Sequence, residues 1–144
     1  SAKDRTLVDQ ALERCDLLAL GSRAITELSG GELQRTCIAR ALAQEARILL
    51  LDEPLSQLDI GHQKDILALL ESLAVEGHTI IMALHDLNLA LAHCDRALVL
   101  AKGQLLRDGE PERVIDEDLI REAWGTEVFM ASDPRRQGKR FILW

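Results

Sequence analysis

The chain has 144 residues and a formal net charge of −7; 47% of its residues are hydrophobic, but only 3% are aromatic. This length suits one domain whose core is built from aliphatic side chains, and the acidic balance argues against a general nucleic-acid binder, which would carry a basic face. No apolar run approaches the ~20 residues that a membrane-spanning helix needs, and no signal peptide is present, so we expect a cytosolic protein.

The first residues and the cysteines carry no chemistry of their own. Apolar residues at helical spacing, such as Ala11 and Cys15, predict a helix over about residues 4–15. Cys15, Cys37 and Cys94 lack metal-ligand spacing, so we expect buried thiols in a reducing compartment. Because the sequence has no initiator methionine and opens inside a helical pattern, we expect a piece of a longer protein.

A loop that leads directly into a helix is predicted at residues 28–35, Leu-Ser-Gly-Gly-Glu-Leu-Gln-Arg. Ser29 and Glu32 form a capping box, in which each side chain satisfies a backbone N–H at the helix start. Gly30 and Gly31 carry no Cβ, so another molecule can approach the backbone closely. A capped helix after a Gly-Gly turn explains these residues alone. Exposed amides and the positive end of a helix dipole also make a site for a phosphate.

Two strands joined by a helix follow. Unbroken apolar runs at residues 48–51 and 79–84 are typical of strands covered on both faces in a parallel sheet, and an apolar stripe predicts a helix over residues 61–76 between them. Pro54 ends the first strand because it cannot donate to a ladder. Strand, helix and strand make a βαβ unit with a right-handed crossover, so the predicted fold class is α/β.

The rest of the chain alternates short helices with short strands. Asp86 is a candidate cap for a further helix, and Lys102 and Gly103 form the turn of a predicted hairpin. Two short helices follow, the first opened by a proline. Weak strands at about residues 126–130 and 140–143 close the chain around a polar turn.

Three polar features follow strand ends, where a parallel sheet places its ligands. Asp52 and Glu53 point in different directions, so that Asp52 can hold Mg²⁺ while Glu53 orients and deprotonates an attacking water. The loop at residues 56–59 ends in Asp59, which either lines a neighbouring site or caps the next helix. His85 follows the second strand, where we expect it beside Glu53, able to hydrogen-bond a terminal phosphate. An acidic loop, a turn and a satisfied strand end are the plainer interpretations of the same three features.

In this order, the features resemble an ABC-transporter ATP-binding subunit over essentially the whole chain. Residues 28–34 resemble the signature motif, 48–53 Walker B, 56–59 the D-loop and His85 the switch histidine. The resemblance implies an ATPase that uses ATP and Mg²⁺ and works by positioning and electrostatics. ATP-driven dimerisation of two such subunits would energise transport.

The resemblance also implies a role for each motif residue. The signature residues would contact the γ-phosphate of ATP held by the second subunit of a head-to-tail pair: Ser29, Gly30, Gly31, Glu32 and Gln34. Asp52 would serve the metal, Glu53 the hydrolytic water and His85 the γ-phosphate, the latter two as catalytic residues. Asp59 would make a cross-subunit contact at the nucleotide.

One family element is missing. No G-x-x-x-x-G-K-[ST] motif (Walker A) occurs in the sequence, nor does the family's glutamine loop. The chain therefore resembles the C-terminal part of a nucleotide-binding domain, with the helical subdomain at 1–45, the Walker B, D-loop and switch core at 46–108, and a C-terminal extension at 109–144. Its expected fold is a partial P-loop NTPase-type fold, a parallel sheet flanked by helices with a small C-terminal hairpin region. We expect this fragment to be inactive by itself.

Within the family, two stretches resemble importers of iron chelates, haem and cobalamin. These are residues 86–90, Asp-Leu-Asn-Leu-Ala, and 124–128, Trp-Gly-Thr-Glu-Val, in a pattern that molybdate-type importers share. The resemblance implies membrane permease subunits as partners, a substrate-binding protein as an indirect one, and no nucleic acid. It also implies a peripheral location on the cytoplasmic face of the cell membrane.

Two other classes stay open. The C-terminal halves of SMC-type chromosome and DNA-repair ATPases also carry a signature and Walker B without Walker A. They need a long heptad repeat before the signature, whereas residues 1–20 offer one short helix followed by a Gly21-Ser22 break. A non-catalytic interaction module derived from the ATPase is the third candidate, which a test of ATP turnover would separate from the enzyme.

Overall fold

A computed structural model of the chain describes residues 1–132, 134 and 139–143. It divides into two compact units, Ser1–Ala83 and Leu84–Trp144, and each is described by itself. Most of the predicted polar turn before residue 140, and the last residue of the chain, lie outside the described residues.

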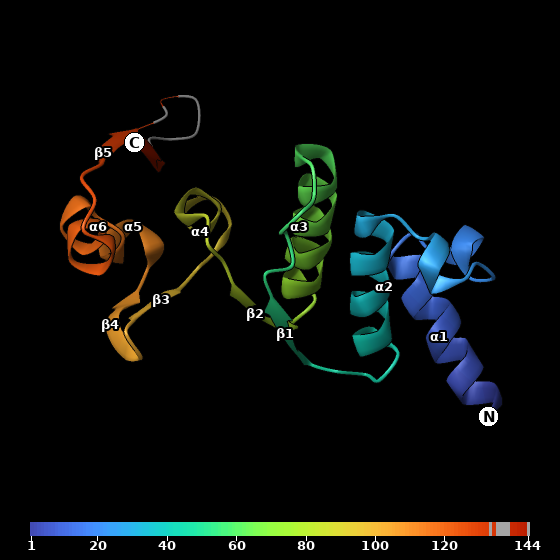
Figure 1. The fold of residues 1–144 in the computed structure, drawn as a ribbon. Coiled ribbons are helices and arrows are strands. Elements are labelled where there is room, and N and C mark those ends of the chain that lie inside the picture. Colours follow the sequence, from blue (N-terminus) through green and yellow to red (C-terminus); the bar gives the residue numbers. More distant parts are fainter. Residues whose placement is uncertain (133, 135–138, 144) are drawn as a thin grey trace. The chain divides into compact units, whose positions relative to one another are not determined.

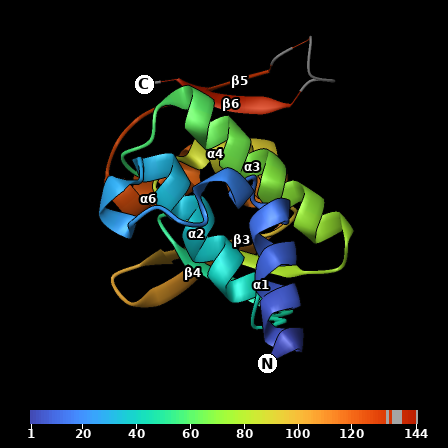
Figure 2. The same cartoon turned by 90° about the vertical axis from the view of Figure 1, so that its right-hand side faces the viewer.

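The first unit contains three helices and two strands (Figure 1). In chain order its elements are α1 (Ala2–Arg14), the 3₁₀ turns η1 (Leu18–Leu20) and η2 (Ile25–Glu27), α2 (Gly30–Leu42), β1 (Ile48–Asp52), α3 (Ile60–Val75) and β2 (Thr79–Ala83). α2 lies between α1 and α3 and contacts both, and Figure 2 views this unit with α1 nearest to the reader. The core is made of aliphatic side chains from these helices and β1, among them Ala11, Ile38, Leu49, Ile66 and Leu73.

β1 and β2 form the predicted parallel pair. Ile48 lies opposite Thr79 and Asp52 opposite Ala83, with α3 between the two strands in the chain. The strand–helix–strand prediction is therefore confirmed. Because the strands run in the same direction and end in register, their carboxyl ends lie at one edge of the sheet.

The two strands are covered on one face only, so the prediction of strands buried on both faces is wrong. Leu49 is buried, whereas its neighbours Ile48 and Leu50 are 60% and 75% exposed, and Ile81 of β2 is 48% exposed. Alternate residues of a strand point to opposite faces. The apolar run does indicate two faces suited to burial, but the described part of the chain covers only one of them.

The cysteines also differ from the prediction of three buried thiols. Cys15 is buried in the first unit, and this burial raises the pKa of its thiol to about 11. Cys94 is half-buried, and Cys37 is exposed on α2. Cys37 precedes the fully buried Ile38, and one step along a helix turns a side chain away from the core-facing side.

The described residues of the second unit form two hairpins and three short helices. Its elements are α4 (Leu87–His93), β3 (Ala97–Ala101), β4 (Gln104–Gly109), α5 (Pro111–Val114), α6 (Glu117–Trp124), β5 (Phe129–Ser132) and β6 (Arg140–Leu143). The predicted β3–β4 turn is confirmed, since Lys102 and Gly103 both have positive φ, as a two-residue type I′ turn requires. Gly125 ends α6 in a left-handed conformation, and β5 begins at Phe129, later than the predicted start at about residue 126.

The core of this unit gathers residues from most of its elements. It consists of Leu91, Val99, Ile115, Leu119, Ile120, Val128 and Ile142. These side chains are aliphatic throughout, as the low aromatic content of the sequence requires. Two of the unit's aromatic side chains, those of Trp124 and Phe129, are 52% and 75% exposed and lie outside this core.

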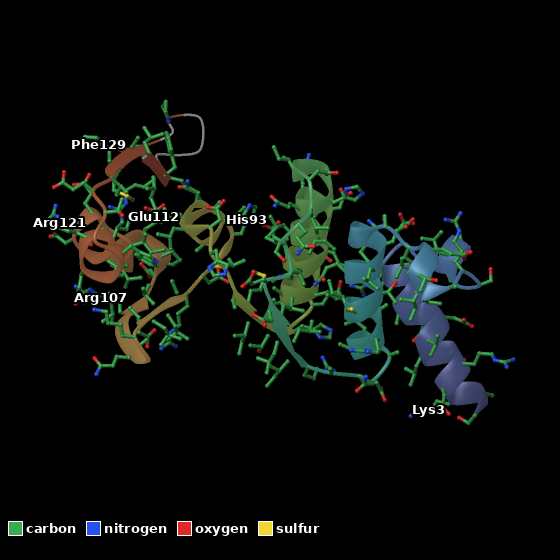
Figure 3. The ribbon with its side chains drawn as sticks, in the orientation of Figure 1. Lys3, His93, Arg107, Glu112, Arg121 and Phe129 are labelled. Carbon is green, nitrogen blue, oxygen red and sulfur yellow. The ribbon has the colours of Figure 1, made fainter. Side chains whose placement is uncertain are left out.

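Asn88 and Glu112 form hydrogen bonds with backbone groups on the edge of β6 that faces away from β5. Asn88 of α4 donates through Nδ2 to the carbonyl of Ile142 at 3.2 Å and accepts the N–H of Ile142 at Oδ1 at 2.7 Å. Glu112 of α5, labelled in Figure 3, accepts the backbone N–H of Arg140 at 3.1 Å and its Nε–H at 2.9 Å. These bonds satisfy edge groups of the kind that a two-stranded hairpin leaves unpaired, and they fix the hairpin to α4 and α5.

Replacing Asn88 with leucine is expected to loosen this hairpin. The change leaves the N–H and carbonyl of the buried Ile142 without their partners, and each unsatisfied buried group costs about 1–3 kcal/mol. Denaturant unfolding of the chain measures the loss, and hydrogen exchange of the Ile142 amide locates it. Asn88→Asp is the matched control, because it keeps the acceptor for the Ile142 N–H and should lose less. Equal stability of Asn88→Leu and the unchanged chain would contradict the prediction.

Candidate functional site

The predicted capping box is present at the start of α2. Oγ of Ser29 accepts the N–H of Glu32 at 3.3 Å, and Oε2 of Glu32 accepts the N–H of Ser29 at 2.7 Å. Hydrogen bonding to the Ser29 backbone, the larger effect, and to the Ser29 side chain holds the pKa of the Glu32 carboxyl below its usual range. Ser29 and Gly30 are exposed, and first-turn N–H groups have no intrahelical acceptor. The anion site predicted at this helix end is thus sterically open at these two residues.

Gly31 differs from this expectation. It is buried, and a Cβ at this position would lie 2.6 Å from Cδ2 of His62. The space that the glycine leaves is therefore occupied by a side chain of the same chain rather than being open to another molecule. Gln34, one turn further along α2, is half-buried.

Asp52 and Glu53 lie where the sequence predicts, at the carboxyl end of β1. Asp52 is the last strand residue and Glu53 the first after it, and both are exposed. Glu53 has a positive φ of 46°, a conformation that costs a non-glycine residue about 1–3 kcal/mol and is concentrated at functional sites. Ser56 stabilises this turn, because its Oγ–H and its backbone N–H both donate to the carbonyl of Glu53, at 3.0 and 3.1 Å.

Asp59 caps α3, so the capping interpretation of this residue is confirmed. Its Oδ1 accepts the backbone N–H of His62 at 2.9 Å, and its Oδ2 lies 2.8 Å from Nδ1 of the same residue. These two bonds, the backbone one first, hold the pKa of the Asp59 carboxyl below its usual range. Gln63 fixes the loop before the helix by donating to the carbonyls of Leu55 and Leu58 at 3.1 and 3.2 Å.

His85 is exposed and lies two residues beyond β2, directly before Asp86, which caps α4. The side chain of Asp86 accepts the N–H groups of Asn88 and Leu89, as the sequence predicts. His85 belongs to the second unit and Glu53 to the first. Their approach therefore stays a prediction, although the strands that precede them end in register.

Sequence reasoning missed His62 and Gln63. Both lie in the first turn of α3: His62 contacts Gly31 of the signature helix and Asp59 of the D-loop, whereas Gln63 donates to the carbonyl of Leu58 in the D-loop. For His62 the spacing from Asp59 was available as a signal: a residue three positions after a capping aspartate donates its N–H to the cap, so its side chain starts close to that carboxylate.

The donor set at the end of β1 fits Mg²⁺ with a nucleotide. Among the described residues, no group of three or more His, Cys, Asp or Glu side chains gathers to hold a metal. A protein site for Mg²⁺ bound with a nucleotide needs one or two carboxylates, the remaining ligands being phosphates and waters. The exposed Asp52 supplies such a carboxylate. Asp52 would thus hold the ion, and a bound Mg²⁺ would neutralise phosphate charge.

The sequence is similar to ATP-binding import proteins. The family model for ABC transporters matches residues 1–56. The hemin import ATP-binding protein of Rhodococcus jostii is 40% identical over 93% of this chain and 46% of its own length. The petrobactin import protein FpuC of Bacillus anthracis is 43% identical over 96% of the chain and 54% of its own, and a cobalamin import protein of Halobacterium salinarum is 42% identical over 91% and 33%.

The fold is similar to those of solved ABC transporter structures. The structure of a metal-chelate type ABC transporter, described in an inward-facing conformation, matches with a TM-score of 0.88 at 28% identity, over 96% of this chain and 56% of that one. cbiO1 of Clostridium perfringens, part of the ABC transporter complex cbiONQ, matches with a TM-score of 0.69 at 36% identity, over 75% and 43%.

The fold is a partial P-loop NTPase-type fold of the ABC ATPase class. The chain is similar to a portion of the ABC-transporter ATP-binding subunits, and it spans about half the length of most of the curated relatives that it matches. In the part of the chain that the structure describes, no helix combines the length and apolarity needed to cross a membrane.

Proposed function

We propose that the chain is part of the ATP-hydrolysing subunit of a bacterial ABC importer for an iron chelate, haem or cobalamin. Relatives whose names specify hemin, petrobactin and cobalamin import support this substrate range. Such a subunit would dimerise head to tail on ATP and act on permease subunits at the cytoplasmic face of the membrane. In this proposal residues 1–45 belong to the helical subdomain, 46–108 to the catalytic core and 109–144 to a C-terminal extension.

One observation carries the proposal: two acidic residues of different geometry end a strand at the edge of a parallel pair. Asp52 keeps the extended conformation of β1, whereas Glu53 turns away at positive φ with its carbonyl held by Ser56. The two carboxylates therefore serve two roles, Asp52 as the Mg²⁺ ligand and Glu53 as the base that orients the attacking water.

The remaining motif residues complete this proposal. The signature residues would contact the γ-phosphate of a nucleotide that the second subunit holds: Ser29, Gly30, Gly31, Glu32 and Gln34. The exposed hydroxyl of Ser29 and the amides of the first turn of α2 are suited to an anion. Asp59 would contact the partner subunit beside the nucleotide, and His85 would hydrogen-bond the γ-phosphate.

The chain by itself is expected to show no appreciable ATP turnover. Its sequence has no Walker A motif, and so lacks the lysine and the loop amides that cradle the β- and γ-phosphates. Phosphate release by the purified chain, followed with Mg²⁺ and ATP over a range of protein concentrations, measures this. Turnover that rises with chain concentration and disappears in Glu53→Gln would contradict the prediction.

The test of the function joins this chain to the N-terminal half of a relative such as the hemin import protein, giving a complete subunit. The proposal expects ATP turnover that requires Mg²⁺. Three bacterial strains, each lacking the ATP-binding subunit for hemin, ferric-siderophore or cobalamin import, then report which uptake the subunit restores. A folded, dimer-competent chimera that never hydrolyses ATP would instead support the non-catalytic interaction module.

A further inference from the structure

His62 of α3 lies directly against the first turn of α2. A Cβ on Gly31 would lie 2.6 Å from Cδ2 of His62, 3.1 Å from its Cγ and 3.4 Å from its Cβ. The imidazole therefore fills the volume that any other residue at position 31 would occupy. Gly31 is buried by this ring, and the position of the ring bears directly on the backbone of the signature motif.

The same ring is bound on its other side to the D-loop. Nδ1 of His62 lies 2.8 Å from Oδ2 of Asp59, and Oδ1 of Asp59 accepts the backbone N–H of His62 at 2.9 Å. An ionised carboxylate only accepts hydrogen bonds, so Nδ1 carries the proton toward it. Two bonds between one pair of residues fix the carboxylate and the ring in a single relative orientation.

A second contact joins the same two motifs. A Cβ on Gly30 would lie 3.4 Å from Cδ2 of Leu58, the residue before Asp59. Gln63, next to His62 in α3, donates to the carbonyls of Leu55 and Leu58 and so fixes the loop that carries this contact. Gly30 therefore lies against Leu58 and Gly31 against His62. The first turn of α3 fixes both, since it contains His62 and its Gln63 holds the loop of Leu58.

We propose that His62 is a positioning residue that couples the carboxylate of Asp59 to the backbone of Gly31. This inference rests on the proposed function, in which Asp59 and the signature motif act at nucleotides shared with a second subunit. A change at Asp59 on contact with that subunit moves the ring, and the ring moves the amides of the first turn of α2. Both motifs then respond together to one event at the subunit interface.

Amide NMR of the 144-residue chain tests the coupling with four forms: the unchanged chain, Asp59→Asn, His62→Phe and the double variant. Asparagine is as good a helix cap as aspartate, so α3 should persist, and phenylalanine keeps the ring but removes the Nδ1 donor. We expect Asp59→Asn to shift the Gly31 amide signal in the unchanged background, and this shift to be lost in the His62→Phe background. Asp65→Asn, which removes an exposed charge elsewhere on α3, is the control and should leave Gly31 unshifted. Equal shifts in both backgrounds, or none in either, would overturn the proposal.

A stability cycle keeps the test valid if His62→Phe fails to fold. Gly31→Ala should lower the denaturant midpoint in the unchanged chain, and this loss should shrink in the His62→Ala background, where the ring is gone. Additive losses would overturn the coupling. Both measurements need no nucleotide, so they distinguish a failure of the coupling from a failure of the proposed ATPase.

A positioning role also has a kinetic signature that simple packing lacks. In the completed subunit, His62→Phe should lower kcat for ATP more than it changes KM. His62→Asn, whose side-chain amide can again donate to Asp59, should restore part of kcat. Equal activity of His62→Phe and the unchanged subunit would count against the role, whereas inactivity of the unchanged subunit would count against the proposed function alone.

Discussion

Glutamine in place of Glu53 is expected to lower ATP turnover of the completed subunit by about 10²- to 10⁴-fold, the usual contribution of a general base. Glutamine keeps the size and much of the hydrogen bonding of glutamate, so the strained turn at positive φ and its bonds from Ser56 should persist. What it loses is the ability to accept a proton from water. Nucleotide binding should therefore remain while hydrolysis stops, and the variant should accumulate as an ATP-bound dimer.

Steady-state phosphate release and size-exclusion chromatography with ATP measure these two effects. Glu13→Gln is the matched control, because Glu13 is an exposed glutamate of α1 outside the proposed site. Asp52→Asn should differ from Glu53→Gln, since loss of the Mg²⁺ ligand weakens the response to Mg²⁺ as well as the rate. A Glu53→Gln subunit that keeps more than about a tenth of the unchanged rate would remove Glu53 from the proposed catalytic role.

Alanine in place of Ile66 is expected to lower the free energy of unfolding of the first unit by about 2–5 kcal/mol, the typical cost of emptying a buried isoleucine site. Ile66 is 0% exposed on α3, and α3 packs against both α2 and β2. Since α3 also carries Asp59 at its start, this loss should free the D-loop as well as the helix.

Ile60→Ala is the matched control for this prediction. Ile60 lies on the same helix but is 85% exposed, and surface substitutions usually change stability by no more than about 0.5 kcal/mol. Denaturant unfolding measures the loss of stability in both variants. Ile66→Val, which empties less of the site, should lose about 0.5–1.5 kcal/mol and so fall between Ile60→Ala and Ile66→Ala. Equal losses at positions 60 and 66 would mean that the core does not lie where the structure places it.

The local features of the site were predictable because they depend on neighbours in the sequence. The capping box of Ser29 and Glu32, the cap at Asp86 and the Lys102-Gly103 turn each need only a few consecutive residues. The parallel pairing of β1 and β2 was also predictable, because two apolar runs joined by a single helix favour that crossover.

The environment of Gly31 was not predictable in the same way. The sequence shows that its backbone lacks a Cβ, but not whether a ligand or a side chain of the same protein fills the space. The answer depends on how α2 crosses α3, a tertiary contact between residues 31 positions apart. The exposure of Ile48 and Leu50 was missed for a related reason, since an apolar pattern indicates a preference for burial and not the presence of a covering layer.

The uncovered face of the β1–β2 pair has a practical consequence for anyone who handles this polypeptide. Ile48, Leu50 and Ile81 form an apolar patch on a sheet of only two strands in the described part of the chain, and such surfaces favour self-association. Solubility rather than folding would then limit the concentration at which the polypeptide can be studied.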